Sequence, residues 1–268
     1  MYGAILGDIV GSRFEFHNYK EKDFELFTYD CEFTDDTVMT IAVEKALMES
    51  GYKFWNLSKK TRYFLREFGR KYPHLSYGTN FKGWLLENGR KSTNSYGNGA
   101  AMRVNGVGWI CTDLKQVKRM SRVVTTVSHS HLEAIKGAEA IASCIYLAKT
   151  KHSKDEIRAY IENNYYPLNF TVQKIRETYG YNVSCQRSVP QAIECFLESV
   201  DFEDALRIAI SLGGDSDTIG AMTGAIAEAY YGIPSWMVEK AKEYLPNELI
   251  RVENQFYEYL NNQHFQVL

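Results

Sequence analysis

Three glycines spaced four residues apart near the start of the chain constrain the fold more than any other feature. Gly3, Gly7 and Gly11 lie in a segment that is otherwise mostly apolar. A glycine inside a helix costs about 1 kcal/mol relative to alanine, so three of them require a packing reason. In a helix this spacing places all three on one face. The segment therefore predicts a helix on which another helix packs very closely.

The rest of the chain shows the apolar periodicity of amphipathic helices. No stretch alternates with a period of two, no internal repeat is visible, and no linker divides the chain. The sequence therefore predicts an all-α fold, with a single domain over residues 1–268. Residues 73–100 are expected to be mostly loop with a short helical turn at 84–86, and residues 150–186 to hold one helix and a surface excursion. The other helices are expected at 38–47, 54–72, 132–149 after a polar start at 128–131, 192–197, 202–210, 220–231 and 235–260.

The balance of charges excludes some classes of partner. Lysine and arginine number 31 against 33 aspartates and glutamates, which gives a net charge of −2. The longest basic tract, residues 59–62, is short. A general binder of nucleic acid or of anionic membranes would carry a basic face or run. We therefore expect neither partner, and any phosphate group should be bound locally.

The cysteines and the apolar segments indicate where the protein works. The five cysteines are odd in number, widely spaced and never arranged as C-x-x-C, which is typical of reduced thiols rather than of disulfides or a zinc site. Residues 1–8 lack the basic region of a signal peptide. The apolar run 219–238 contains Glu228 and is broken by Gly232 and Pro234, which indicates a buried core helix rather than a membrane span. The sequence thus predicts a cytoplasmic protein, and we expect a monomer.

Two short segments carry oxygen ligands suited to hard metal ions. Residues 213–218 place two aspartates and a threonine after a pair of glycines, and residues 34–37 repeat this chemistry far upstream. Thr34 is also a plausible N-cap for the helix that follows. Acids at a helix start stabilise it by roughly 0.3–1 kcal/mol without any metal, so each segment alone has an ordinary explanation. Two such segments, both leading into apolar helices, favour a metal site.

A polar loop and two histidines suggest contacts to a ligand. Residues 92–103 combine glycines with small hydrogen-bonding side chains, and such a loop can hold a phosphate on its backbone amides. The loop matches neither common phosphate-binding motif, so an ordinary loop leading into a helix is the alternative. His129 and His131 are two residues apart and cannot share a helical face. This spacing argues against a paired histidine metal site and indicates single contacts to a ligand or to the backbone.

Taken together, these segments resemble the ADP-ribosylglycohydrolase family, which includes the dinitrogenase-reductase-activating glycohydrolases and the ADP-ribosyl-acceptor hydrolases. The resemblance implies a compact orthogonal multi-helix domain with two adjacent Mg²⁺ or Mn²⁺ ions in a central cleft. It also implies an enzyme that removes ADP-ribose from a modified acceptor by cleaving the bond at C1″ of the ribose. Four blocks in the family's order carry the resemblance: residues 3–12 with Glu15, 34–37, 96–103 with 128–129, and 213–218.

The resemblance also implies a role for each matching residue. Glu15 matches a mobile glutamate near the ribose; it, or an aspartate of the pairs such as Asp36, would activate water or protonate the leaving atom. Carboxylates this crowded repel one another, so we expect the site to be poorly ordered or destabilised without metal. The implied metal ligands are Thr34, Asp35, Asp36, Asp215, Asp217 and Thr218. The implied contacts to the diphosphate and outer ribose are Ser95, Tyr96, Gly97, Asn98, Gly99 and His129.

Two other functions are alternatives. A metal-dependent phosphohydrolase would need Asp-x-Asp-x-Thr, but Thr218 stands one residue too close to Asp217. A non-catalytic ADP-ribose-binding or structural member of the same fold would be expected to have lost ligands, whereas both acidic segments are intact here. The acceptor stays open: an ADP-ribosylated protein modified on a side chain such as arginine or serine, a nucleic-acid end, or a small ADP-ribosyl ester.

Overall fold

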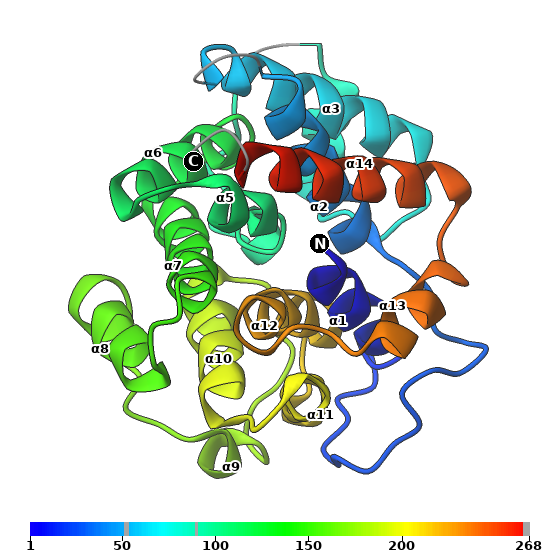
Figure 1. Cartoon of the computed structure of the whole chain (residues 1–268). Coiled ribbons are helices and arrows are strands. Elements are labelled where there is room, and N and C mark those ends of the chain that lie inside the picture. Colours follow the sequence, from blue (N-terminus) through cyan, green and yellow to red (C-terminus); the bar gives the residue numbers. More distant parts are fainter. Residues whose placement is uncertain (51–53, 89–90, 265–268) are drawn as a thin grey trace.

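Helices form all the regular secondary structure of the described residues in the computed structural model, which are 1–50, 54–88 and 91–264 (Figure 1). Two isolated bridges join loop residues without forming a strand in this part of the chain. The predicted all-α fold class is therefore confirmed. The elements are α1 (Tyr2–Ser12), α2 (Asp35–Met48), α3 (Leu57–Lys71), α4 (Thr79–Leu86), the short 3-10 helix η2 (Asn98–Ala100), α5 (Asn105–Ile110), α6 (Leu114–Thr126), α7 (Leu132–Lys149), α8 (Lys154–Asn164), α9 (Val172–Ile175), α10 (Cys185–Glu198), α11 (Phe202–Leu212), α12 (Ser216–Tyr231), α13 (Ser235–Lys242) and α14 (Asn247–His264).

The glycine-rich helix α1 packs directly on α12, as the spacing of its glycines predicts. Gly3 lies against Gly224, and Gly7 lies against Gly220. A Cβ atom added at Gly7 would lie only 2.0 Å from the carbonyl oxygen of Gly220. Glycine is therefore required for the two backbones to come this close. Because the pairing runs in opposite directions along the two helices, the end of α1 meets the start of α12.

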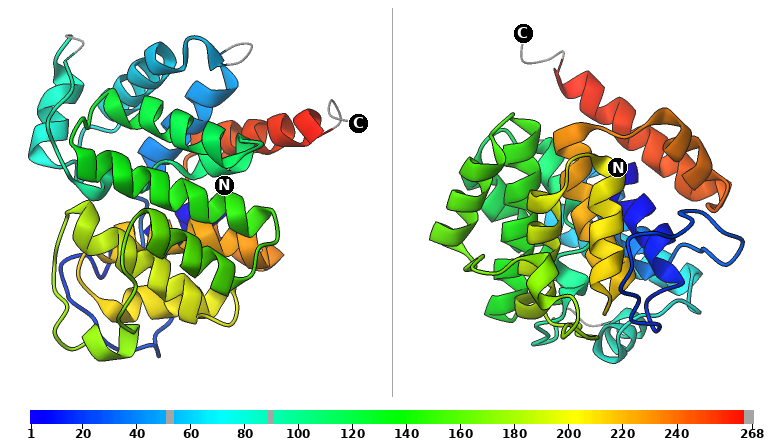
Figure 2. Two further views of the ribbon diagram at one scale, coloured as in Figure 1. Left: turned by 90° about the vertical axis from the view of Figure 1, so that its left-hand side faces the viewer. Right: turned by 90° about the horizontal axis from the view of Figure 1, so that it is seen from below.

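The helix α12 lies at the centre of the domain. Helices α7, α10 and α11 pack on the sides that α1 leaves free (Figures 1 and 2). Every residue from Ser216 to Ala229 is buried. This confirms the buried core helix predicted within residues 219–238. None of the helices in the described ranges combines the length and the apolar character that crossing a membrane requires.

Helix α4 is longer than the short turn predicted at residues 84–86. Its apolar residues Phe81, Trp84 and Leu85 are buried on one face. Their spacing is that of a helix, and burial of this face outweighs the cost of Gly83 inside it. The polar start of α4 is consequently brought beside the loop that precedes η2.

Helices α5 and α6 lie where no helix was predicted, and several helix boundaries also differ from the prediction. The single helix expected over residues 235–260 is divided into α13 and α14, because Pro246 lacks a backbone N–H and stands between them. Helix α10 begins at Cys185 rather than at 192, since Cys185 and Val189 continue the buried face despite Pro190 inside the helix. Residues 150–186 contain the short α9 as well as α8, and Thr171 caps α9.

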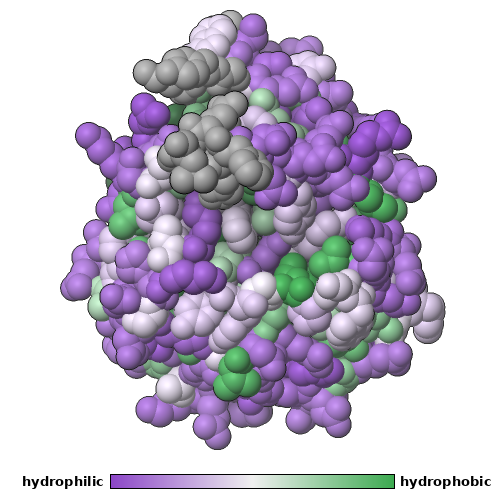
Figure 3. All heavy atoms as spheres, viewed as in Figure 1, coloured by the Kyte–Doolittle hydropathy of each residue, from purple (hydrophilic) through white to green (hydrophobic). Residues whose placement is uncertain are grey.

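Apolar side chains lie mainly between the helices. On the face shown in Figure 3, hydrophobic residues appear as separate spots among hydrophilic ones. All five cysteines are free and buried, so no disulfide joins them, as predicted. The interior is not purely apolar, however, because the end of α1 and the starts of α2 and α12 bring acidic residues into it.

Candidate active site

Six carboxylates from three parts of the chain meet at one partly enclosed position. The end of α1 meets the start of α12, and the first turn of α2 packs on α1. The two acidic segments found in the sequence are thereby brought together. The acids are Asp8, Glu15, Asp35, Asp36, Asp215 and Asp217.

These acids form two groups that share one residue. Carboxylate oxygens of Asp8, Asp36 and Asp217 lie within 4.8 Å of one another, and so do those of Glu15, Asp215 and Asp217. Two neighbouring groups of oxygen ligands with a common carboxylate are a suitable arrangement for a pair of hard divalent cations.

Two buried oxygens in this cluster have no protein donor. Asp36 Oδ1 and Asp217 Oδ1 accept no hydrogen bond within the described chain. Their neighbours are better satisfied: Thr218 Oγ1 donates to Asp36 Oδ2 over 2.9 Å, and Asn98 Nδ2 donates to Asp215 Oδ2 over 2.5 Å. A buried carboxylate oxygen without a donor is costly. The side chains present therefore fit hard cations.

Asp8 belongs to this cluster although the motifs did not identify it as a ligand. It accepts four hydrogen bonds, from N and Oγ1 of Thr34 (2.9 and 2.7 Å) and from N and Oγ1 of Thr37 (3.0 and 2.5 Å). These bonds attach the first turn of α2 to α1 and occupy much of the accepting capacity of the carboxylate. Asp8 thus holds α2 in position. The only available signal was that Asp8 is the single acid inside an apolar, glycine-rich helix.

Thr34 lies in the same network, behind the acids that face the cavity. Its Oγ1 accepts from the amide of Asp36 over 3.2 Å, which confirms the predicted N-cap, and donates to Asp8. The hydroxyl of Thr34 is therefore bonded to other protein groups on both its donor and its acceptor side.

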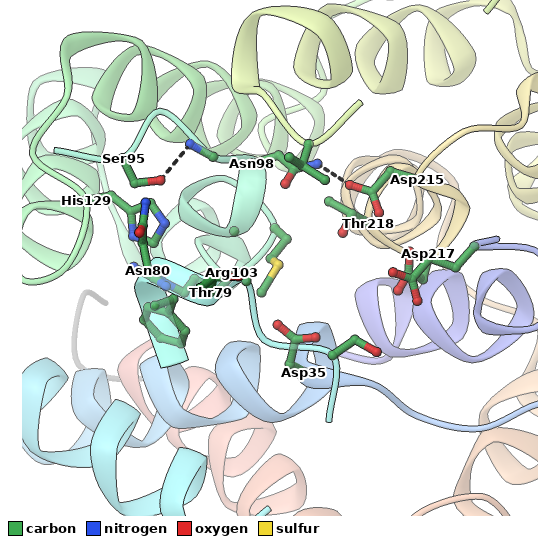
Figure 4. Close-up of a pocket in the computed structure, with 18 of the residues that line it drawn as sticks. Asp35, Thr79, Asn80, Ser95, Asn98, Arg103, His129, Asp215, Asp217 and Thr218 are labelled. Atoms are coloured by element: carbon green, nitrogen blue, oxygen red, sulfur yellow. Dashed lines mark hydrogen bonds between the residues drawn. The ribbon is translucent and has the colours of Figure 1, made fainter. Parts of the chain in front are cut away.

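A cavity of about 360 Å³ opens beside the acids (Figure 4). Asp35, Asp215 and Asp217 lie at one end of it, and Asn80 and His129 lie at the other. Its volume is within the usual range for small-molecule sites. The cavity therefore joins the acidic cluster to the polar loop.

Most of the site residues expected from the sequence line this cavity. Tyr96 does not: its side chain is 51% exposed and packs edge-on against His131, with ring centroids 5.4 Å apart. Thr34 and Asp36 also lie outside the lining. The expected residues that do line it are Glu15, Asp35, Ser95, Gly97, Asn98, Gly99, His129, Asp215, Asp217 and Thr218. The individual roles of all these residues stay predictions.

Other lining residues were not found from the sequence. Asn80 and Phe81 belong to α4, which is longer than predicted. Arg103 is the last residue of the polar segment 92–103, but no motif indicated a role for it. Tyr181 comes from the segment that no motif explained, and its hydroxyl lies 3.5 Å from Glu15 Oε1 as a donor. Glu15 itself is only 8% exposed, so it is not a surface acid.

Burial and mutual repulsion favour protonation of these acids in the absence of cations. Burial, followed by the charges of Asp215 and Asp35, raises the pKa of Glu15 to about 7. Burial, followed by the charges of Asp8 and Asp215, raises the pKa of Asp35 to about 7. The pKa of Asp217 is raised well above its ordinary value, by burial first and by neighbouring acids second. A full set of ionised carboxylates here requires positive charge from outside the cluster.

The fold is shared with a solved structure. A solved structure described as an ADP-ribosylglycohydrolase-related protein complex shares this fold, with a TM-score of 0.70 over 96% of this chain and 93% of that one. The two sequences are 20% identical, and at this level the likeness establishes the fold alone.

The sequence comparison gives the family. A family model described as ADP-ribosylglycohydrolase matches residues 1–264. The chain therefore belongs to the ADP-ribosylglycohydrolase family of enzymes, which confirms the resemblance seen in its motifs. It is 28% identical to ADP-ribosylhydrolase ARH3 of Homo sapiens over 308 residues, covering 86% of this chain and 84% of the relative. It is 25% identical to ADP-ribosylarginine hydrolase Tri1 of Pseudomonas putida (strain GB-1) over 280 residues, covering 90% and 72% respectively.

Proposed function

We propose that the protein hydrolyses an ADP-ribosyl linkage at C1″ of the ribose and releases ADP-ribose from a modified acceptor. The observation that carries the proposal is the pair of acidic groups that share Asp217 beside a cavity of about 360 Å³. Family membership supports hydrolysis of ADP-ribose in general. The names of the two relatives, an ADP-ribosylhydrolase and an ADP-ribosylarginine hydrolase, support the same reaction class.

The proposed site holds two divalent cations, Mg²⁺ or Mn²⁺. Carboxylate and hydroxyl oxygens are the ligands that these ions prefer, and the partnerless oxygens of Asp36 and Asp217 point to a missing positive charge. When bound, such ions stabilise negative charge on ribose oxygens and on the attacking water. The residues proposed to hold them are Glu15, Asp35, Asp36, Asp215, Asp217 and Thr218, with Thr34 and Asp8 supporting them.

Glu15 is the best-placed acid or base of the cluster. It lines the cavity, so its carboxylate can exchange a proton with a molecule bound there. In the proposed reaction Glu15 takes a proton from the attacking water or gives one to the leaving atom of the acceptor. Asp36, the other candidate, lies outside the cavity lining and accepts a hydrogen bond from Thr218.

The opposite end of the cavity suits the diphosphate. Ser95, Asn80 and His129 offer hydroxyl, amide and imidazole groups there, and Gly97 and Gly99 bring the backbone to the cavity. These groups are suited to phosphate and ribose oxygens, whereas the acidic end, with the cations it is proposed to hold, is suited to the hydroxyls of the ribose at the scissile bond. The two ends thus favour one orientation, with the ribose of the scissile bond beside the acids.

A panel of linkages tests the proposal and assigns the acceptor. Peptides carrying ADP-ribose on arginine or on serine, an ADP-ribosylated nucleic-acid end and a small ADP-ribosyl ester would each be incubated with the protein in Mg²⁺, Mn²⁺ or EDTA. Free ADP-ribose would be quantified by chromatography. We expect release from at least one linkage in Mg²⁺ or Mn²⁺ and its loss in EDTA.

Two controls separate the alternatives. Calorimetric titration with ADP-ribose measures binding in the same buffers, so binding without release from any substrate would support the non-catalytic alternative. Asp155, exposed on α8, provides a matched acid outside the site. Asp155→Asn should release ADP-ribose as the wild-type protein does, whereas turnover in EDTA equal to that in Mg²⁺ would contradict the role of the metals.

A further inference from the structure

His129 stands at the end of a hydrogen-bond chain that begins at a buried arginine. Arg103 is fully buried and donates from Nη2 to Ser128 Oγ over 2.7 Å. The same Oγ lies 2.9 Å from His129 Nδ1. His129 Nε2 makes no hydrogen bond within the described chain and faces the glycine loop, where a Cβ added at Gly97 or Gly99 would lie 3.9 Å away.

The donors and acceptors in this chain decide which nitrogen of His129 carries the proton. A guanidinium only donates, so Ser128 Oγ accepts from Arg103 and retains its own proton. Apart from Arg103, the only hydrogen-bond partner of this hydroxyl among the described residues is His129 Nδ1. If Nδ1 were protonated, the buried hydroxyl proton would lack an acceptor, which is costly. Nδ1 is therefore the acceptor, and the ring proton is on Nε2.

The surroundings also disfavour a doubly protonated ring. Burial, followed by the positive charge of Arg103, lowers the pKa of His129 well below its ordinary value. Phe81 packs against both groups, with the Arg103 guanidinium carbon 5.3 Å from the ring centroid and the His129 ring centroid at 5.7 Å. The phenyl ring thus keeps the cation and the imidazole in a fixed relation.

We propose that Ser128, held by Arg103, is a positioning residue that fixes His129 as a neutral imidazole with its Nε2–H turned into the cavity. There the N–H donates to an acceptor oxygen of the substrate's diphosphate. The identity of this ligand rests on the proposed function, but the state of the ring does not. A fixed N–H selects an oxygen that only accepts, as a phosphate oxygen does, and discriminates against a group that must donate at that point.

Histidine side-chain nitrogen spectra test the ring state without any substrate. The protein would be labelled with ¹⁵N-histidine, measured at pH 7, and His129 would be assigned with His129→Gln. We expect Nδ1 to have the chemical shift of an unprotonated nitrogen and Nε2 that of a protonated one. His131 is an internal control, because its Nδ1 accepts the amide of Glu133 over 3.1 Å and this ring needs no serine. A protonated Nδ1 on His129 in the wild-type protein would overturn the proposal.

Variants of Ser128 then test whether the ring state matters for binding. Ser128→Ala should give His129 a mixture of tautomers, leave His131 unchanged, and weaken ADP-ribose binding about 3- to 10-fold. Ser128→Thr, which keeps the hydroxyl, should restore both. In the His129→Gln background, Ser128→Ala should have no further effect on affinity. If Ser128→Ala lowered the affinity for ADP-ribose equally in the wild-type and His129→Gln backgrounds, Ser128 would not act through His129. If no variant bound ADP-ribose and the wild-type protein did not bind it either, this result would contradict the proposed function alone.

Discussion

The helix pair α1–α12 has buried acids at both ends, but the two ends obtain their compensating charge differently. At the active-site end, six carboxylates face one another, and within the described residues none of them forms an ion pair with a lysine or arginine. At the opposite end, the amino group of Met1 is 3.0 Å from Glu44 Oε1 and also pairs with Glu253. All three of these groups are buried.

At the opposite end, Glu228 also accepts hydrogen bonds from two other helices. Glu228 of α12 accepts from the amide of Gly3 over 2.8 Å and from the hydroxyl of Tyr257 over 2.6 Å. Its carboxylate therefore joins α12 to α1 and to α14. The difference between the two ends teaches that burial of acids does not by itself indicate a functional site. A buried acidic cluster that makes no ion pair within the described residues is the better candidate for a ligand site.

The largest expected difference is between two variants in which one acid, at either end of the α1–α12 pair, is replaced by its amide. Asp217→Asn removes the carboxylate common to both groups, so ADP-ribose release should fall about 10³-fold or more, while the unfolding temperature in EDTA should stay equal or rise because repulsion is relieved. Glu228→Gln presents an NH₂ group to one of two donors, so it should cost about 1–3 kcal/mol of unfolding free energy and leave turnover per folded molecule unchanged. Substrate assays and denaturant titrations measure both. Similar turnover in the two variants would remove the distinction between the ends.

A second test concerns proton transfer at the active-site end. Glu15→Gln keeps the size of the side chain but cannot exchange a proton, so kcat should fall about 10²-fold or more. ADP-ribose affinity should stay within about threefold of wild type if the other ligands hold the cations. Tyr181→Phe, which removes the hydroxyl 3.5 Å from Glu15, serves as the milder comparison and should change kcat less than tenfold. Unaltered kcat in Glu15→Gln would assign the proton transfer to another group.

The close crossing of α1 and α12 can be tested with one methyl group. Gly7→Ala places a Cβ 2.0 Å from a backbone oxygen that cannot move aside alone, so it should lower the unfolding free energy by about 3 kcal/mol or more and disturb both ends. Gly83→Ala in α4 is the matched control, since a Cβ there meets nothing within 4 Å and should change stability by no more than about 1 kcal/mol. Equal unfolding midpoints for the two variants would show that α1 and α12 can separate without penalty.

The smallest expected effect is on the pH dependence of stability. Folding raises the pKa of Asp8 from 3.8 to about 6 and that of Glu15 from 4.5 to about 7, so the folded state binds these protons more tightly than the unfolded state. Their contribution to stability is therefore greatest below about pH 4 and is lost as pH rises to about 7. In EDTA the unfolding temperature of the wild-type protein should therefore fall as pH rises over this interval.

Divalent cations should reverse this trend. They interact with the ionised acids, so the gain in unfolding temperature on adding Mg²⁺ or Mn²⁺ should be larger at pH 8 than at pH 5. Scanning fluorimetry across pH, with and without the ions, measures the gain. If the gain in unfolding temperature did not depend on pH, or were equal in Asp217→Asn, the ions would not be acting through this acidic cluster.

The fold was largely predictable because its helices follow local patterns. The spacing of Gly3, Gly7 and Gly11 predicted a close crossing, and the apolar run after residue 218 predicted the central helix. The errors fell where local signals conflicted with burial. Gly83 suggested a loop, but burial of one face of α4 stabilises a helix there. The apolar periodicity continues past Pro246, but the chain forms two helices, α13 and α14, on either side of this proline.

The candidate site was predictable in its residue types and only partly in its geometry. Acids at the starts of α2 and α12 predicted oxygen ligands, and His129 stood in the polar start of the helix that follows residue 131. Asp8, Arg103 and Tyr181 carried no such signal, because their significance lies in what they contact. Tyr96 illustrates the reverse case, since it sits in a polar block but its side chain turns away from the cavity.

The sequence by itself determined the helices, the close-packing face of α1 and the two acidic helix starts, because periodicity, glycine spacing and capping act over a few neighbouring residues. Only the tertiary structure decided that Asp217 belongs to both acidic groups and that Asp8 bonds to α2. It also decided that, among the described residues, one buried acidic cluster contains an ion pair and the other does not. Compensation of charge depends on distances between groups far apart in the chain, and such distances exist only once the helices have packed.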